Sequence, residues 1–412
     1  MNKKKEKIVP ELRFPEFEND GNWAETILDD VADYENGKAH EKEISETGKY
    51  KVVNSKFIST EGEVVKYTNS ANLRASVGDI LMVLSDIPNG RAIAKCFYVD
   101  INDTYTVNQR ICKITPTDIN NKFLFYIQNR NKYFLAFDDG VKQTNLRKDT
   151  VLSFPFFKPK NPNEQLKIAN CLSSLDTLIT AETDKLDHLK DHKKGLLQQL
   201  FPANGETKPQ YRFPEFENDG NWENTTLGKI AKFRRGSFPQ PYGRPEWYDD
   251  ENGMPFIQVY DVDTNLKIKP KTKRKISALA AEKSVFIAKG TVIITIQGSI
   301  GRVAITQYDA FIDRTLLLFE EFYKPIDKLF FAYVIQLLFE IEKEKAPGGI
   351  IKTITKEVLT SFNIYVPDVL EQQRIAKCLS SLDDLITLQT QKTKALQKHK
   401  KGLMQKLFPN IL

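Results

Sequence analysis

The sequence contains two internal repeats, and each of them occurs twice in the same order. The segment RFPEFENDGNW at residues 13–23 returns unchanged at residues 212–222, an offset of 199 residues. Residues 164–202 return as residues 371–409, an offset of 207, with 25 of 39 positions identical. The chain thus runs from a short repeat through a variable block to a long repeat, and then repeats that order. Self-similarity of this kind predicts one structural unit built twice.

The two variable blocks, roughly residues 24–160 and 223–367, have diverged strongly. They keep a faint common skeleton, in which Gly37 and Gly236 each follow an alternating run. One fold with two different surfaces explains this pattern. A duplication without functional asymmetry is the alternative, but it would leave the blocks as similar to each other as the long repeats are.

Both blocks carry the pattern of an α/β fold. Strand-length runs rich in β-branched or aromatic residues occur at residues 80–84, 93–99, 292–296 and 302–306. Residues 123–129 and 329–340 have helical apolar spacing, and residues 203–210 are polar and rich in breakers. The predicted organisation is a first domain at residues 1–160, a first long helix at 161–202, a linker with the second short repeat at 203–222, a second domain at 223–367 and a second long helix at 368–412.

The long repeat has the heptad pattern of a helix that packs on a partner helix. Glu182, Lys193, Gln389, Thr393 and Lys400 interrupt the seam at core-type positions. Each helix could instead simply cover its own domain. A helix of about 38 residues spans roughly 57 Å, however, whereas a domain of about 140 residues has a radius of gyration of about 14 Å. We therefore expect the helices to leave their domains and pack on each other. The predicted seam residues are Ile168, Leu172, Leu175, Ile179, Leu186, Leu189, Leu196, Leu200, Ile375, Leu379, Leu382, Ile386, Leu396, Leu403 and Leu407.

Both long helices have start and stop signals. Asn161 followed by Glu164, and Asp368 followed by Glu371, are typical of a capping box. Proline occupies the first helical position in the first copy, where its missing N–H costs nothing. The Phe-Pro pairs at residues 201–202 and 408–409 predict the helix ends.

Two variable domains separated by two near-identical long helices, with EQ-x-x-IA at each helix start, resemble the specificity subunits of type I restriction–modification systems. The resemblance covers essentially the whole chain. It implies two similar α/β target-recognition domains related by a pseudo-two-fold axis, each of which reads one half of a split sequence in double-stranded DNA. It also implies that the long helices lie antiparallel as a spacer and dock the methyltransferase subunits, which in turn recruit the restriction and motor subunits.

Motifs for catalysis are missing from the sequence. There is no F-x-G-x-G cofactor loop, no D/N-P-P-F/Y/W motif of adenine methylation and no G-x-x-x-x-G-K-S/T phosphate loop. The four cysteines form no C-x-x-C pair. His188 and His192 are spaced so that they could bind a metal, but the second long repeat has Ala395 at the position of His188 and keeps only His399. We expect no catalytic residue, metal or cofactor on this chain; S-adenosylmethionine, ATP and Mg²⁺ would belong to partner subunits, as the resemblance implies.

The composition excludes few classes of function. A net charge of +6 is compatible with a polyanionic partner but is weak support by itself. No stretch approaches the roughly 18 consecutive apolar residues of a membrane helix. The lysine-rich N-terminus lacks an apolar segment behind it, so a secretory signal is not expected. We predict a cytoplasmic protein.

Residues suited to nucleic acid are concentrated in the second block. Residues 267–275, KIKPKTKRK, carry six basic residues and no acid. In an extended chain the alternating lysines would face one side and could follow phosphates, although an exposed solubilising strand is the alternative. Arginine and glutamine can read guanine and adenine edges, respectively. The candidate DNA-binding residues are Lys38, Arg91, Asn108, Gln109, Arg110, Gln143, Arg234, Arg235, Gln240, Tyr242, Arg244, Lys267, Lys269, Lys271, Lys273, Arg274, Lys275, Arg302, Arg314 and Lys352.

The short repeat is interpreted as a structural anchor. Its identity in both halves argues against sequence reading, which would differ, so Phe14, Phe17 and Trp23 are expected to pin the start of a domain to a helix end. Two functional alternatives remain from the residues alone. One is a duplicated coiled-coil adaptor without a DNA role, and the other is a self-sufficient nuclease with an unrecognised site.

Overall fold

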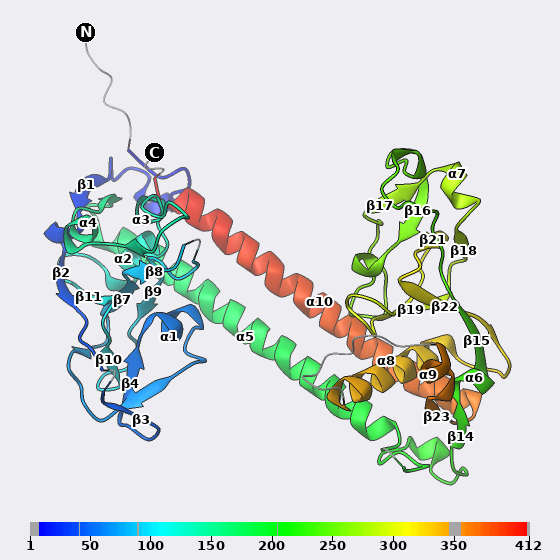
Figure 1. Ribbon diagram of the computed structural model, residues 1–412. Helices are drawn as coiled ribbons and strands as arrows, with labels where there is room; N and C mark the ends of the chain where they lie inside the picture. Colours follow the sequence, from blue (N-terminus) through cyan, green and yellow to red (C-terminus); the bar gives the residue numbers. More distant parts are fainter. Residues whose placement is uncertain (1–7, 41, 89, 204, 346–355, 410–412) are drawn as a thin grey trace. The chain divides into compact units, whose positions relative to one another are not determined.

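The computed structural model describes residues 8–40, 42–88, 90–203, 205–345 and 356–409 (Figure 1). The chain divides into two compact units. Unit 1 comprises Met1–Thr183 with Lys392–Leu412, and unit 2 comprises Asp184–Gln391. The division falls inside both long helices, so each unit contains one part of each helix.

Unit 1 is built around a four-stranded antiparallel sheet in the order β2-β11-β7-β9. A second sheet has the order β3-β5-β4-β10-β6, in which β4 and β10 are parallel. The four side chains of β7 are all buried, because Ile80 and Met82 join one apolar cluster and Leu81 and Val83 join another. The bounds in unit 1 are β1 (Ala24–Ile27), β2 (Ala32–Asn36), β3 (Ile44–Ser45), β4 (Tyr50–Val53), α1 (Ser55–Ser59), β5 (Lys66–Thr68), β6 (Arg74–Ala75), β7 (Ile80–Val83), β8 (Ser85–Asp86), β9 (Cys96–Tyr98), β10 (Tyr105–Val107), β11 (Ile111–Pro116), α2 (Asn121–Gln128), α3 (Lys132–Leu135), β12 (Thr144–Asn145), α4 (Lys148–Leu152) and β13 (Pro155–Lys158).

Unit 2 repeats this plan with a different sequence. Its central antiparallel sheet has the order β15-β22-β19-β20, and a second sheet has the order β17-β16-β21-β18, in which β16 and β21 are parallel. The side chains of β19 are all buried, like those of β7. The bounds in unit 2 are β14 (Glu223–Thr226), α6 (Leu227–Ile230), β15 (Ala231–Arg235), β16 (Met254–Ile257), β17 (Arg274–Ile276), α7 (Ala278–Ala281), β18 (Val285–Ile287), β19 (Val292–Thr295), β20 (Val303–Ile305), β21 (Ala310–Ile312), β22 (Leu316–Phe322), α8 (Lys328–Lys345), α9 (Lys356–Ser361) and β23 (Asn363–Val366).

The predicted strand at residues 93–99 is shorter than expected. β9 begins only at Cys96, because the preceding residues form a turn. The carboxylate of Asp86 accepts the backbone N–H groups of Ala92 and Ile93 at 2.6 and 3.0 Å. Ala94 then adopts a left-handed conformation, with φ of 53°. The apolar run thus contains a side-chain-stabilised turn that its periodicity does not reveal.

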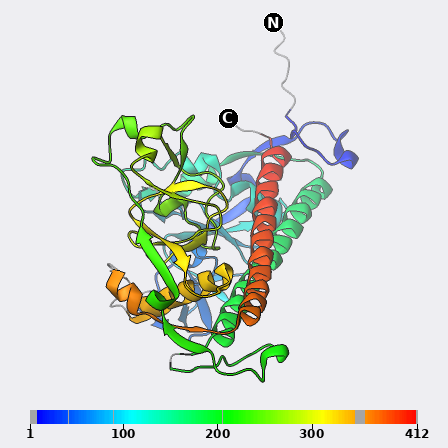
Figure 2. The same ribbon diagram turned by 90° about the vertical axis from the view of Figure 1, so that its right-hand side faces the viewer.

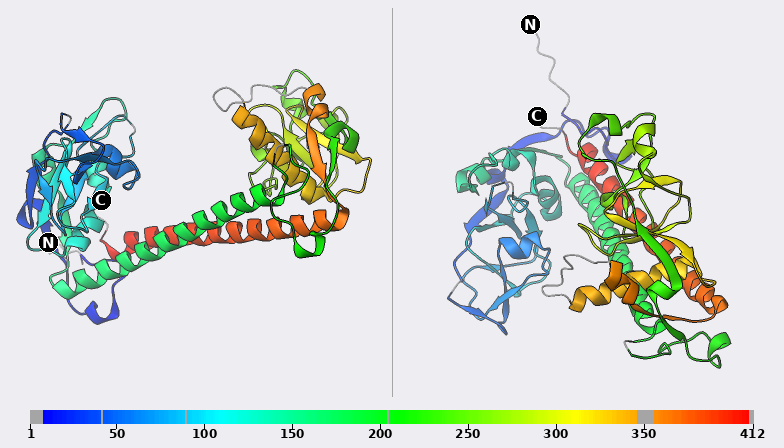
Figure 3. Two further views of the ribbon diagram at one scale, coloured as in Figure 1. Left: turned by 90° about the horizontal axis from the view of Figure 1, so that it is seen from below. Right: turned by 45° about the vertical axis from the view of Figure 1, so that its right-hand side comes forward.

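The long helices are α5 (Pro162–Leu200) and α10 (Val369–Leu407), and they lie side by side (Figures 2 and 3). Their direction is antiparallel within each unit. In unit 1 Lys400 pairs with Asp176 and Lys392 pairs with Glu182, so rising numbers in one helix meet falling numbers in the other. In unit 2 Lys193 pairs with Asp383 at 2.6 Å.

The long helices both cover their own domains and pack on each other. Ile168 and Leu172 of α5 pack with Trp23 of the first domain and also with Leu407 of α10. In unit 2, Leu200 of α5 joins the domain core that contains Leu379. The helix ends therefore cover their domains and also contact the partner helix. Several positions that interrupt the seam, such as Lys193 and Lys400, form the ion pairs described above.

The capping-box prediction is wrong for Glu164 and Glu371. The Oδ1 atom of Asn161 does accept the N–H of Asn163 at 3.0 Å. Glu164 and Glu371, however, are buried and bind Arg13 and Arg212, respectively. Burying a carboxylate is costly, and an ion pair with arginine offsets this cost better than the N–H groups of a helix terminus would alone.

Candidate nucleic-acid interface

In unit 1, a tight crossing of two chain segments gathers several of the predicted DNA-binding residues. The N–H of Gly37 donates to the Ile111 carbonyl at 2.8 Å, and the N–H of Lys38 donates to the Val107 carbonyl at 3.0 Å. A Cβ at position 37 would lie 2.0 Å from the carbonyl oxygen of Asn108, so only glycine fits. The crossing places Lys38 beside the β10–β11 connection, which carries Asn108, Gln109 and Arg110.

Unit 2 has the same crossing with different side chains. The N–H groups of Gly236 and Ser237 donate to the carbonyls of Leu316 and Ile312 at 3.0 and 3.1 Å. A Cβ at position 236 would lie 2.4 Å from the Asp313 carbonyl oxygen. The exposed Arg234 and Arg235 precede this glycine, and the exposed Arg314 lies in the facing β21–β22 connection.

An aromatic cluster with cations on its faces lies next to the crossing in unit 2. Phe238 packs against Tyr242 and Tyr248 with ring centroids 4.8 and 5.6 Å apart. The guanidinium of Arg314 lies 5.2 Å from the centre of the Tyr242 ring, and that of Arg274 lies 3.8 Å from the Tyr248 ring. These contacts hold flat, cationic groups in defined positions, which suits both phosphate and base-edge contacts.

The basic run at residues 267–275 is not the straight ladder that the alternation predicted. The chain bends at Pro270 and Lys271, and the β17 strand begins only at Arg274. Buried Asp261 organises the bend: its carbonyl accepts the N–H of Lys269 at 2.8 Å, and its Oδ1 accepts the N–H of Lys273 at 2.9 Å. Burial is the main cause that raises the pKa of Asp261.

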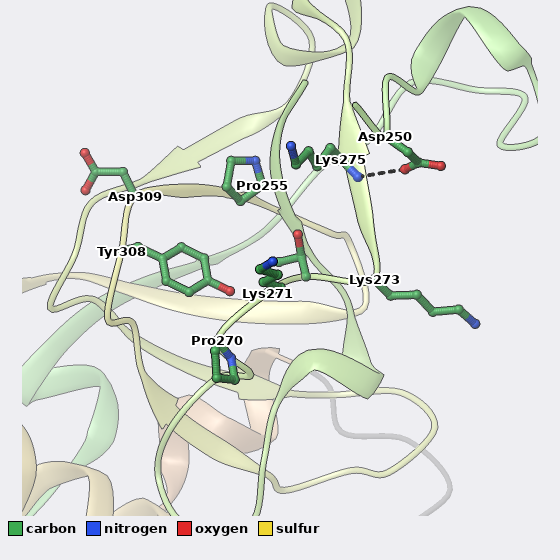
Figure 4. Close-up of a pocket in the computed structure, with 9 residues that line it drawn as sticks. Asp250, Pro255, Pro270, Lys271, Lys273, Lys275, Tyr308 and Asp309 are labelled. Carbon is green, nitrogen blue, oxygen red and sulfur yellow. Dashed lines mark hydrogen bonds between the residues drawn. The ribbon is translucent and has the colours of Figure 1, made fainter. Parts of the chain in front are cut away.

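The bend forms one wall of an open pocket of about 480 Å³ (Figure 4). Lys271, Lys273 and Lys275 line it together with Asp250 and Tyr308. The six basic residues therefore have different surroundings. Lys275 donates its ammonium to the Glu251 carbonyl at 2.7 Å, whereas Lys269, Lys271 and Lys273 are exposed. Arg274 pairs with Asp250 at 3.1 Å, and Lys267 lies 3.5 Å from Asp384 of α10.

The remaining candidates are scattered or have structural contacts. Arg91 is exposed in the loop that Asp86 organises, and Gln143 donates to the Ser85 hydroxyl at 2.7 Å in the neighbouring β8–β12 pair. Arg302 is half-buried and donates to the Val262 carbonyl at 3.3 Å, a contact within the domain. Arg244 pairs with Glu246 at 3.2 Å.

The last two candidates are Gln240 and Lys352. Gln240 is exposed between Phe238 and Tyr242. Lys352 lies outside the described residues, so the structure assigns it no position.

A set of contacts that the sequence patterns did not predict joins each domain to the long helices. Glu164 binds Arg13 in bidentate fashion at 2.8 and 2.7 Å and accepts the indole N–H of Trp23 at 3.2 Å. Glu371 binds Arg212 in the same way at 2.8 and 2.6 Å. The short repeat is thus an anchor, as expected, and its partner is the glutamate of the EQ pair.

The glutamine of each EQ pair has an equally defined role. Gln165 accepts the N–H of Asn120 at 2.9 Å, next to the start of α2. Gln372 accepts the N–H of Asp327 at 2.9 Å, next to the start of α8. The occurrence of EQ in both long repeats was the signal that could have revealed these contacts.

The described ranges contain neither a metal-binding cluster nor a membrane-spanning helix. Within these residues no three His, Cys, Asp or Glu side chains gather as a metal site would require. Among the helices of the same ranges, none combines the length and apolarity needed to cross a membrane.

The fold is that of a type I restriction–modification specificity subunit. The crystal structure of the S subunit of such a system from M. genitalium matches 98% of this chain and 100% of its own, with a TM-score of 0.64 and 19% identity. A structure solved in a study of complex assembly and conformational transition of the type I restriction–modification system matches 95% and 98%, respectively, with a TM-score of 0.56 and 18% identity.

Sequence comparison places the chain in the corresponding family. The model of the type I restriction modification DNA specificity domain matches residues 20–191 and 219–398, so the chain belongs to this family. It is a DNA specificity subunit of a type I restriction–modification system, a recognition component and not the catalytic one.

Curated relatives agree with this assignment. The protein of Methanocaldococcus jannaschii assigned as the MjaX specificity subunit is 24% identical over 84% of this chain and 81% of its own. The EcoR124I/EcoR124II specificity subunit of Escherichia coli is 25% identical over 66% of each chain.

Proposed function

We propose that the chain reads a bipartite DNA target, with one half-site contacted by the glycine crossing of each unit. The observation that carries this proposal is that one scaffold presents two different surfaces. The crossing in unit 1 carries Lys38 and Arg110, whereas the crossing in unit 2 carries Arg235 and Arg314 beside an aromatic cluster. Two independent readers of base edges require this combination, the same backbone geometry with different side chains.

Phosphate contacts are assigned to the bent basic run of unit 2. Lys269, Lys271 and Lys273 are exposed on a segment that Asp261 holds in place. Lysines of this kind neutralise phosphates and release counterions, which raises affinity for every sequence alike. Specificity would then come from the arginines at the crossing.

The long helices are the proposed docking site for methyltransferase subunits, through which the restriction subunits join the complex. Leu178 of α5 and Leu385 of α10 are exposed at 42% and 50%, respectively, and occupy equivalent positions of the long repeat. Exposed leucines on paired helices are suited to an apolar partner surface. S-adenosylmethionine, ATP and Mg²⁺ are assigned to those partner subunits.

The proposal is tested with the purified chain, alone and in complex with its methyltransferase subunit. The complex is expected to methylate adenines in a split site, and the chain alone is expected neither to methylate nor to cleave DNA. Turnover of DNA or S-adenosylmethionine by the chain alone would overturn the assignment. A complex that forms but has no preference for any DNA sequence would favour the adaptor alternative.

A further inference from the structure

A tyrosine, an aspartate and a lysine meet where each domain contacts both long helices. In unit 1 the Tyr126 hydroxyl of α2 donates to Asp176 of α5 at 2.7 Å, and Asp176 also binds Lys400 of α10. The Lys400 ammonium lies 5.3 Å from the centre of the Tyr126 ring. Three elements are therefore joined by one carboxylate and one ring, and we call this set the unit 1 triad.

Unit 2 contains the same set, the unit 2 triad. The Tyr333 hydroxyl of α8 donates to Asp383 of α10 at 2.6 Å, and Lys193 of α5 binds Asp383 at 2.6 Å. The Lys193 ammonium lies 5.3 Å from the centre of the Tyr333 ring. Each member stands 207 residues from its counterpart, which is the offset of the long repeat.

The tyrosines of the triads are buried, whereas their ion pairs are partly exposed: the side chains of Lys400 and Asp176 are exposed at 23% and 38%, and those of Lys193 and Asp383 at 13% and 14%. Tyr126 and Tyr333 are exposed at 5% and 1%, respectively. Burial, followed by the hydrogen bond to aspartate, raises the pKa of both phenols, so they remain hydrogen-bond donors at neutral pH. Charge-assisted hydrogen bonds in such surroundings are stronger and more directional than exposed ones.

Beside the apolar packing of the helices on each domain, two sets of polar contacts in each unit lie at different levels of the helix. The first is the bidentate pair at the helix start, Arg13–Glu164 or Arg212–Glu371. The second is the triad, whose aspartate lies 12 residues further along the helix, about 18 Å at 1.5 Å per residue. Polar contacts at the helix start alone constrain the tilt of a domain less than contacts at two levels this far apart.

We propose that the two triads are positioning elements that set how strictly the complex discriminates the gap between half-sites. The inference rests on the proposed function, because it assumes that the two units read two half-sites. With a triad intact, a domain has one orientation on the helix pair. Without it, the domain keeps its arginine–glutamate pair, its glutamine contact and its apolar packing at the helix, but it tilts more readily about them, so targets with a longer or shorter gap become acceptable.

The test measures adenine methylation by the complex on DNA whose gap is native, one base pair shorter or one base pair longer. Tyr126→Phe and Tyr333→Phe remove one hydrogen bond each and keep the ring under the lysine. We expect the preference for the native gap to fall about tenfold, the change in an equilibrium that the loss of one charge-assisted hydrogen bond produces. Half-site bases should be unchanged. Asp187→Asn is the matched control, because Asp187 is exposed on α5 and pairs with Lys190 of the same helix.

Lys400→Met and Lys193→Met provide a second pair of variants, since methionine keeps apolar contact with the ring and removes the charge. The same relaxed gap preference is expected of them. Methylation that falls equally at all gaps, or a gap preference that stays as in the wild type, would overturn the inference. If the wild-type complex itself does not recognise a split site, the proposed function fails. This result is obtained before any variant is made, so it is distinguishable from a failure of the inference.

Discussion

At the scale of single residues, the arginine–glutamate pairs show how a repeat can be identical in sequence without reading DNA. The side chains of Arg212 and Glu371 are exposed at only 9% and 1%, respectively. A buried guanidinium is tolerated only with a paired carboxylate, because burial of an isolated charge is costly. The pair, together with the Asp219 and Gly220 carbonyls that accept from Arg212, gives the segment a structural role that does not depend on the DNA sequence.

We therefore expect Glu371→Ala to destabilise unit 2 by about 3–5 kcal/mol, since it leaves Arg212 buried without its carboxylate. Urea unfolding measures the change. Glu215→Ala is the control, because Glu215 binds Arg374 in an ion pair in which both side chains are about half exposed, and solvent screens that pair. Equal losses for the two variants would contradict the argument.

The basic residues at 267–275 have different surroundings, so we expect their replacement to have different effects. Lys271→Gln together with Lys273→Gln is expected to weaken binding of the complex to all DNA sequences and to lower the salt slope by about 2, because each lysine neutralises about one phosphate. Lys275→Gln should have less effect, since its ammonium is engaged by the Glu251 carbonyl. Binding measured across a salt series distinguishes these variants, and a change in the preferred bases would argue against phosphate contacts.

At the scale of elements, the long helices combine an apolar seam with polar pairs that define their register. Asp176–Lys400 in unit 1 and Lys193–Asp383 in unit 2 occur where the heptad pattern fails. Leucine seams alone tolerate sliding by one heptad, whereas specific ion pairs between the helices disfavour it. The residues that interrupt the heptad pattern thus help to set the register of the two helices.

Insertion of seven residues after Thr180 and after Thr387 tests whether helix length sets the gap. Each helix lengthens by roughly 10 Å, equivalent to about three base pairs, and both triads keep their partners because the two insertions shift the antiparallel alignment equally. We expect a gap wider by up to that amount, less whatever DNA bending absorbs, with unchanged half-site bases. Methylome mapping of the variant decides the matter. An unchanged gap with retained activity would mean that the helices are not the ruler.

At the scale of the whole molecule, duplication gives two units of similar topology with separate cores. The two central sheets have equivalent strand orders, and the internal contacts of each unit define it as a compact body. Replacing residues 223–367 with the matching block of a related protein should therefore change one half-site and leave the other as it was. Methylated motifs mapped before and after the exchange provide the measurement. A simultaneous change in both half-sites would contradict independent reading.

The sequence by itself determined the duplication, the α/β class of the variable blocks and the limits of the long helices. Repeats and heptad periodicity are local patterns in the chain, and local patterns can be read without coordinates. Of the predicted seam residues, Ile168 and Leu172 are buried, whereas Leu175 and Ile179 are half-buried. The family assignment also depended on the order of the repeats and not on any single residue.

Only the tertiary structure decided which polar residues act together. Glu164 resembles a capping residue in sequence but binds Arg13, 151 positions away, and the bend at Pro270 depends on Asp261, which precedes it in the chain. Tyr126, Asp176 and Lys400 come from three separate elements, and no periodicity connects them. Their association depends on desolvation and hydrogen-bond geometry, which are properties of the packed chain and leave almost no trace in the spacing of residues along it.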